Sequence, residues 1–241
     1  MGVGMQEIRP EQIVKKGESH AILSIVFSNE EYGQTVNSLR DQTVPNDEII
    51  ASKTYPDKEH HVRVMRAIND SLATVNLDDY DYILITAGDV EFPRNFLEEC
   101  IKSNIDVFAP GDVLFFKMSA FKKLGGKIPN NPATDSYLAF LAMERGLRVK
   151  SANGMFRPLR RVGELRSPIA YLEYGKQAYR LGYEPVHIIF LSINASIHFS
   201  NPKFLIEPFG YAYALFRRVD KLDVARFVFR RQIGKLSNIL S

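Results

Sequence analysis

The chain has 241 residues, of which 45% are hydrophobic and 24% are charged. This composition is that of a folded globular protein with a sizeable core, and it excludes a disordered chain and a small fold that depends on disulfides. The formal net charge of +3 is unevenly spread. Residues 151–241 carry 14 Lys/Arg and 6 Asp/Glu (+8), whereas residues 1–150 carry 17 Lys/Arg and 22 Asp/Glu (−5). Phosphates or anionic lipid would therefore be attracted to the C-terminal part.

Residues 1–18 are mostly polar, so we expect an N-terminal tail there and no secretory signal. Beyond them, short apolar runs rich in β-branched residues alternate with segments of helical spacing. The strand candidates are 21–27, 47–52, 82–86, 105–109, 113–116 and 147–151. The helix candidates are a segment ending near residue 40, 59–74, a segment after Pro93, 119–124 and 134–145. This alternation predicts an α/β fold with a mostly parallel sheet flanked by helices, which would bind ligands at the carboxyl ends of its strands.

After about Pro168 the pattern becomes helical, with candidates at 168–181, 186–193 and 208–240, the last of them interrupted by breaks. We therefore divide the chain into a tail (1–18), an α/β domain (19–166) and a basic, helical C-terminal extension (167–241). The single cysteine, Cys100, falls in an amphipathic segment, which favours a buried structural thiol and a reducing compartment such as the cytoplasm. No run of about 18 apolar residues is present, so we expect no transmembrane helix.

An acidic motif follows the third strand candidate. Residues 83–93 read Ile-Leu-Ile-Thr-Ala-Gly-Asp-Val-Glu-Phe-Pro, so an apolar strand leads to Asp89 and Glu91 and then to a proline that suits a first helical turn. Other segments add to this pattern: the first strand with its Asn-Glu turn (22–30), Leu-Arg-Asp-Gln-Thr (39–43), Ala-Ile-Asn (67–69), Thr-Asp-Ser-Tyr-Leu (134–138) and Glu-Arg-Gly-Leu-Arg-Val (144–149). Over residues 20–150 this ordered set resembles the family 2 inverting glycosyltransferases, which implies a GT-A (Rossmann-like) fold and metal-assisted sugar transfer from a nucleotide-sugar donor.

The resemblance implies that Asp89 is a ligand of Mg²⁺ or Mn²⁺, with Glu91 as a second ligand and His198 as a late histidine on the metal. A carboxylate at a strand end suits this role because a departing diphosphate builds negative charge, which a divalent ion neutralises. Two plainer interpretations stay open. Asp89 is also compatible with a solvated turn beside Gly88, and His198 with an ordinary hydrogen-bonded histidine.

Inversion requires a base that takes the proton of the acceptor hydroxyl, and the resemblance assigns this role to Asp135. The alternative for Asp135 is a capping role at the start of its helix. Arg66, with its neighbour Arg63, suits diphosphate oxygens, although a solvated charge on the helix surface would look the same in sequence. The residues expected to bind the donor are Asn29, Glu30, Asp57, Arg66 and Asn69.

The chain departs from the family pattern in three places. Ala87 stands where the acidic motif usually begins with Asp. Residues 52–54 read Ser-Lys-Thr where many members place an acidic residue that binds the nucleotide base, with Asp57 only nearby, so a nucleotide other than a uridine nucleotide, or a lipid-phosphate donor, stays open. The chain also has no tryptophan, so it lacks the Gln-x-x-Arg-Trp motif of processive synthases, and single-sugar transfer is expected. We therefore expect a hexosyltransferase-like enzyme, and the alternative is a catalytically weak or inactive protein that binds sugar nucleotides or glycans.

Two rival activities are disfavoured. A nucleotidyltransferase would carry a Gly-rich basic loop after the first strand, where this chain has Ser-Asn-Glu-Glu at 28–31. Nothing resembles a nucleic-acid-binding motif, so we expect no nucleic-acid partner.

The C-terminal segment carries an apolar stripe at three- and four-residue intervals. Its members are Leu222, Ala225, Phe229, Ile233, Leu236 and Leu240. Arg230, Arg231 and Lys235 lie off the stripe, so the helix would suit an anionic membrane on the cytoplasmic face and a lipid-linked acceptor. Packing on the α/β domain or on a second copy in a homodimer would explain the same stripe.

Overall fold

A computed structural model of the chain describes residues 20–28, 32–53, 60–131, 133–160 and 167–240. The chain divides into two compact units. Unit 1 contains Met1–Pro129 and Lys150–Arg157, and unit 2 contains Asn130–Val149 and Pro158–Ser241. Residues 130–149, which we placed in the α/β domain (19–166), group with the C-terminal helices, although Val149 also begins the edge strand of the sheet described next.

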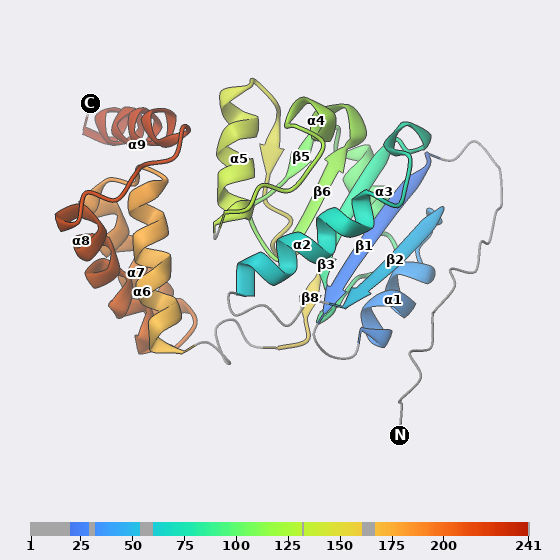
Figure 1. The fold of residues 1–241 in the computed structure, drawn as a ribbon, viewed down its shortest axis with the longest axis horizontal. Coiled ribbons are helices and arrows are strands. Elements are labelled where there is room, and N and C mark those ends of the chain that lie inside the picture. Colours follow the sequence, from blue (N-terminus) through green and yellow to red (C-terminus); the bar gives the residue numbers. More distant parts are fainter. Residues whose placement is uncertain (1–19, 29–31, 54–59, 132, 161–166, 241) are drawn as a thin grey trace. The chain divides into compact units, whose positions relative to one another are not determined.

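A mixed sheet forms the centre of unit 1, with strand order β2-β1-β3-β6-β5-β7 (Figure 1). Its strands are β1 (Ile22–Ser28), β2 (Glu48–Lys53), β3 (Tyr82–Ala87), β5 (Val107–Phe108), β6 (Val113–Lys117) and β7 (Val149–Lys150). β1 pairs in parallel with β2 and β3, whereas β6 runs antiparallel to both β3 and β5. β2, β1, β3 and β5 therefore share one direction, which confirms the predicted mostly parallel sheet. β6 is reversed because only four residues separate it from β5, too few for a parallel crossover.

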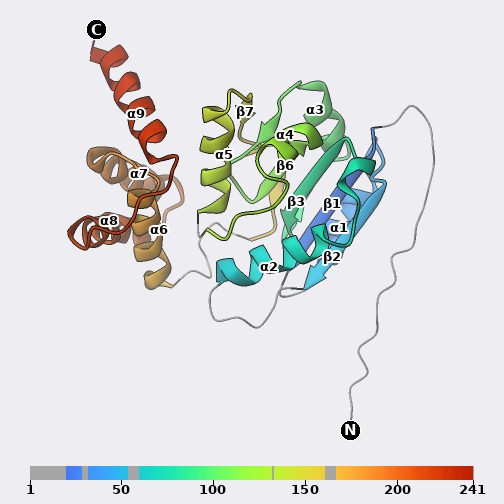
Figure 2. The ribbon, with the colours of Figure 1, turned by 45° about the horizontal axis from the view of Figure 1, so that its top comes forward.

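Helices cover both faces of this sheet (Figures 1 and 2). They are α1 (Gly33–Arg40), α2 (His60–Leu72), α3 (Phe96–Lys102) and α4 (Met118–Lys123). Two smaller elements complete this part of the chain: a 3-10 turn η1 (Leu77–Asp79), and a two-stranded ribbon of β4 (Val90–Glu91) and β8 (Arg157–Pro158). On one face, α1 and α3 share a core cluster with Leu84 of β3 and Phe115 of β6. On the other face, Phe116 of β6 packs against Phe121 of α4 with ring centroids 5.3 Å apart, since successive strand residues alternate between faces.

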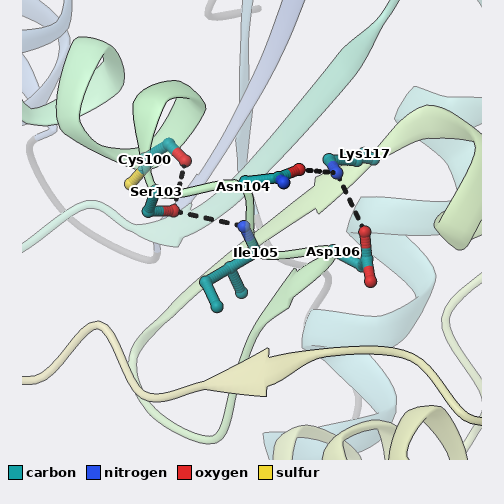
Figure 3. Close-up of polar contacts among 6 residues, drawn as sticks. All are labelled: Cys100, Ser103, Asn104, Ile105, Asp106 and Lys117. Atoms are coloured by element: carbon teal, nitrogen blue, oxygen red, sulfur yellow. Dashed lines mark hydrogen bonds and ion pairs between the residues drawn. The ribbon is translucent and has the colours of Figure 1, made fainter.

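The end of α3 is tied to the strands that follow it (Figure 3). Ser103 Oγ donates to the Cys100 carbonyl at 2.7 Å and accepts from the Ile105 amide at 3.3 Å. Lys117 Nζ then donates to Asn104 Oδ1 at 3.0 Å and to Asp106 Oδ1 at 2.9 Å. Cys100 is 1% exposed, and burial, followed by the charge of Glu99, raises its thiol pKa to about 12. The prediction of a buried structural thiol is confirmed.

Unit 2 is helical, as the sequence predicts for residues after Pro168. Its elements are α5 (Thr134–Glu144), α6 (Pro168–Arg180), α7 (Pro185–His198), a 3-10 helix η2 (Pro202–Ile206), α8 (Glu207–Phe216) and α9 (Ala225–Leu240). Side-chain caps fix two of the starts: Ser167 Oγ accepts from the Ala170 amide, and the Glu184 carboxylate accepts from the His187 amide. Each cap is followed by a proline, which suits the first helical position.

Two glycines set the contact between α6 and α8. A Cβ built on Gly175 would lie 1.9 Å from the Glu207 carbonyl oxygen, and one built on Gly210 would lie 2.0 Å from the Leu172 carbonyl oxygen. Real Cβ atoms do not approach backbone atoms so closely. The two helices therefore touch backbone to backbone, and no larger residue fits at either position.

The first turns of α9 pack within unit 2. Val224, Ala225 and Val228 are buried, whereas Phe229 and Ile233 are 43% and 44% exposed. The buried face therefore centres on Val228, which is not part of the predicted stripe. In the described part of the chain, no helix is long and apolar enough to cross a bilayer.

Candidate functional site

Asp89 follows the carboxyl end of β3, where parallel strands of an α/β sheet bind ligands. The register pairs Phe27 of β1 with Ala87 of β3, so the chain leaves both strands at the same edge. Asp89 then lies in the tight turn between β3 and β4 and is half-buried. Among the described residues its carboxylate makes no hydrogen bond or ion pair, so its oxygens are open to a ligand.

A buried threonine of α1 holds this turn. Thr35 is 0% exposed, and its Oγ1 donates to the carbonyl oxygens of Gly88 and Val90, both at 2.7 Å. The same oxygen accepts from the Val90 amide at 3.2 Å. One hydroxyl thus binds the backbone on both sides of Asp89. Nothing in the sequence around Thr35 marks this role, because its partners lie more than fifty residues away.

Gly88 brings the turn close to β1. Its amide donates to the Phe27 carbonyl at 2.9 Å, and a Cβ at this position would lie 2.7 Å from the Ser28 Cβ and 2.9 Å from the Tyr32 Cβ. Both obstacles are atoms next to the backbone, which cannot rotate away. Gly88 is therefore required for the close approach of the acidic turn to the end of β1.

We predict that replacing Thr35 with valine destabilises the protein by about 1–3 kcal/mol, because it keeps the shape but leaves the Val90 amide without its partner. Replacing Thr35 with serine keeps the hydroxyl and removes one buried methyl group, at a cost of about 0.8 kcal/mol. Urea unfolding of the two variants measures both costs. A valine variant as stable as the serine variant would show that the hydroxyl does not hold the turn.

Two residues of the motifs named above have structural partners in unit 1. The Gln42 amide group donates to the Ser38 and Pro93 carbonyls at 2.8 and 2.9 Å, and its oxygen accepts from the Leu97 amide at 3.1 Å, so it fixes the start of α3. Asn69 forms a reciprocal pair with the backbone of Ile128, at 2.8 and 2.9 Å. Asn69 therefore anchors α2, and its role in donor binding stays a prediction.

Glu91 lies on β4 and forms an ion pair with Arg157 of β8, with an N–O distance of 2.5 Å. This pair links the two strands of the ribbon beside the acidic turn. The cation satisfies part of the Glu91 carboxylate, whereas the Asp89 carboxylate has no such neighbour among the described residues. Asp89 is therefore the stronger of the two candidate metal ligands.

The remaining donor-binding candidates fall into two groups. Arg66 is exposed on α2 and forms an ion pair with Asp70 one turn later, at 3.8 Å, while Arg63 on the same helix is half-buried. Asn29, Glu30 and Asp57 lie outside the described residues.

The other two predicted site residues belong to unit 2. Asp135 lies in the first turn of α5 and is half-buried. The pKa of Tyr183 is raised to about 12, first by burial and then by the charge of Asp135, which identifies Tyr183 as a neighbour of this carboxylate. His198 is the exposed last residue of α7, and its ring contacts Phe199 at 4.7 Å between centroids. The candidate residues are thus divided between the two units.

The residues in unit 1 fit a divalent ion that is shared with a ligand. Within the described ranges, no group of three or more His, Cys, Asp and Glu side chains could hold a metal on its own. A hard cation such as Mg²⁺ commonly uses one or two carboxylates and takes its other ligands from phosphate oxygens and water. The open oxygens of Asp89 match that arrangement.

Comparison with known proteins adds the fold class. No protein-family model matches the chain, and no curated protein matches it significantly in sequence. Among solved structures, the chain is similar to the mannosyltransferase PcManGT from Pyrobaculum calidifontis in complex with GDP-Man and Mn²⁺. The two sequences are 15% identical, the TM-score is 0.53, and the match covers 90% of this chain and 81% of the mannosyltransferase chain. It is also similar to a mutant of Drosophila beta-1,4-galactosyltransferase 7 in complex with manganese, UDP-Gal and xylobiose, with 16% identity, a TM-score of 0.43, and coverage of 58% and 71%. The first likeness shows an α/β fold of the GT-A type.

Proposed function

We propose that the chain is a metal-dependent, inverting glycosyltransferase that moves one hexose from a nucleotide-sugar donor to a glycan or lipid-linked acceptor. The observation that carries this proposal is the Asp89 carboxylate, which is open and follows β3 at the ligand-binding edge of a GT-A-type sheet. The mannosyltransferase with the same fold was solved with GDP-Man and Mn²⁺, which supports the choice of substrate class and metal.

In this proposal, Asp89 would hold Mg²⁺ or Mn²⁺ when the donor is bound. The bound ion would supply a positive charge that offsets the charge growing on the departing nucleoside diphosphate. The protein contributes a rigid support, since Thr35 binds the backbone on both sides of Asp89.

Asp135 is the proposed base. Its carboxylate would take the acceptor hydroxyl proton while the acceptor oxygen forms its bond to the anomeric carbon and the bond from that carbon to the phosphate oxygen breaks. Attack from the face opposite the leaving group inverts the anomeric centre. Asp135→Asn is expected to lower the transfer rate by about 100-fold or more, with donor binding unchanged.

A donor screen tests the proposal. Thermal unfolding is followed with GDP- and UDP-sugars, each with and without Mn²⁺, and transfer is assayed with the donor that stabilises most. A donor at about 100 times its Kd adds about 2.7 kcal/mol of stability, which is easily measured as a rise in Tm. If no donor stabilises the protein and none is hydrolysed, the proposed glycosyltransferase activity is rejected.

A catalytically inactive binding protein is the second candidate. Ala87 replaces the first acidic residue of the motif, and Glu91 is already paired with Arg157, so fewer carboxylates face the donor than in the family. This candidate predicts metal-dependent stabilisation by a donor without transfer or hydrolysis. Mass spectrometry of the donor after prolonged incubation separates the two.

A further inference from the structure

Exposed apolar side chains gather in unit 2. Among the residues up to 234 whose exposure the structure describes, the large apolar side chains that are exposed all lie between Ile169 and Ile233. Apart from Ile169 of α6 (69%), the most exposed of them belong to α7 and α8: Val186 (69%), Phe190 (67%), Ile197 (75%), Phe209 (70%) and Phe216 (83%). The surface of a soluble monomeric protein rarely exposes so many large apolar residues on neighbouring elements, so this surface is expected to bind a partner.

α7 is apolar on its outer side. Its exposed large apolar residues follow helical spacing on a single face: Val186, Ile189, Phe190, Ile193 and Ile197. The exposed polar residues of the helix, Asn194 and His198, lie beside this face. The side facing the rest of the unit holds Ser192, which is 0% exposed and donates to the Glu207 carboxylate at 3.3 Å. The inner side of α7 thus holds this serine together with the buried Ile188 (5% exposed), while an apolar stripe of the same helix remains outside.

A second stripe continues on the neighbouring elements. Leu205 of η2 and Phe209, Tyr213 and Phe216 of α8 are exposed at intervals of three or four residues. α7 contacts both η2 and α8, and the helices lie side by side in both views (Figures 1 and 2). We call these two stripes together the α7–α8 surface.

The helical part of the chain around this surface carries an excess of positive charge, since residues 167–241 contain ten Lys/Arg and five Asp/Glu. In the segment 184–220, Glu184 and Glu207 are half-buried and accept hydrogen bonds from the His187 amide and from Ser192, and Asp220 is the one exposed acidic residue. The same segment contains the cations Lys203, Arg217 and Arg218, and the two arginines are exposed at the end of α8. An apolar stripe beside exposed cations complements the acyl chains and the headgroups of an anionic bilayer.

We propose that the α7–α8 surface lies in the interface of an anionic membrane. The 14 residues of α7 extend about 21 Å, shorter than the roughly 30 Å hydrocarbon core, so the helix would lie along the surface rather than span it. A second copy fits less well, because a symmetric pair would bring together two segments 167–241 that each carry ten Lys/Arg and five Asp/Glu. The inference rests on unit 2 alone and holds whether or not the chain transfers sugar.

Vesicle flotation of the full chain tests this proposal. Wild type is expected to float with vesicles of 70% phosphatidylcholine and 30% phosphatidylglycerol. Its affinity for vesicles of pure phosphatidylcholine should be at least about 25-fold lower, since each of the two exposed arginines near an anionic surface contributes about fivefold. Arg217→Gln with Arg218→Gln should reproduce that loss on the anionic vesicles. Phe190→Ser with Ile197→Ser should lower binding at least about tenfold on the anionic vesicles.

The matched control replaces two apolar residues of α9, which are also exposed. Phe229→Ser with Ile233→Ser should change binding less than about twofold, because α9 lies outside the proposed surface. All variants should remain folded at the temperature of the flotation assay, which thermal unfolding checks, and the arginine variant should unfold like wild type because both side chains are exposed. Equal binding by the α7 variant and wild type, or no flotation of wild type, would overturn the proposal. The proposal would also be overturned if light scattering showed a stable dimer that the α7 substitutions dissociate, while wild type did not bind the vesicles.

Discussion

Replacing Asp89 with asparagine is expected to lower the rate of sugar transfer by at least about 100-fold and to remove the extra stability that Mn²⁺ gives with the donor. Asparagine has nearly the same shape but carries no charge, so it cannot offset the positive ion. Because the Asp89 carboxylate has no partner among the described residues, the free energy of unfolding should change by less than about 0.5 kcal/mol. Transfer assays and urea unfolding on the same preparations measure both effects.

Two controls sharpen this test. Asp41→Asn removes a carboxylate that is exposed in the same unit and paired with Arg94 at 3.2 Å, and it should leave transfer unchanged. Glu91→Gln removes the ion pair with Arg157, which is worth up to about 1 kcal/mol, and should lower transfer much less than Asp89→Asn. If Glu91→Gln proves the more damaging change, the metal ligand has been assigned to the wrong carboxylate.

Replacing Gly175 with alanine is expected to destabilise the protein by about 3 kcal/mol, a fall in Tm of about 6–12 °C for a chain of this length. The added methyl would lie 1.9 Å from the Glu207 carbonyl oxygen, so α6 and α8 must move apart. Gly210→Ala should act alike, because its methyl would lie 2.0 Å from the Leu172 carbonyl oxygen. Thermal unfolding followed by far-UV circular dichroism provides the measurement.

Gly234 is the matched control for these substitutions. It is also a helical glycine of unit 2, in α9, but a Cβ built there meets nothing within 4 Å. Gly234→Ala is therefore expected to stabilise the protein by about 0.5–1 kcal/mol, since alanine is the better helix former. Opposite signs at positions 175 and 234 would establish that packing, and not helix propensity, decides the outcome. Equal stabilisation at both would show that α6 and α8 do not touch through their backbones.

Much of the fold could be predicted from the sequence because its signals are local. Short apolar runs placed β1, β2, β3 and β6 to within one or two residues, and helical spacing with prolines and glycines bounded α2, α5 and α6 nearly as well. The direction of β6 could not be predicted, because the side-chain pattern of a strand is the same whichever way it runs. The division of α5 from the sheet unit depends on contacts distant in sequence.

The candidate site was predictable only in part, because some of its residues are recognised only through contacts with residues distant in sequence. An apolar strand ending in Gly-Asp marks Asp89, but Thr35 resembles any helical threonine until its hydroxyl is seen 2.7 Å from the Gly88 carbonyl. The α7 stripe shows a related limit. Periodicity finds an apolar face, but it cannot say whether that face points inward, and here the exposed fractions of Val186, Phe190 and Ile197 show that it points outward.

The glycine contact between α6 and α8 bears on which surroundings the unit tolerates. Helices joined through small residues are held by close van der Waals packing, which does not require water to drive apolar groups together. The same arrangement maintains helix pairs in detergent micelles. We therefore expect the crossing at Gly175 and Gly210 to persist when the aqueous medium around unit 2 is replaced on one side by hydrocarbon.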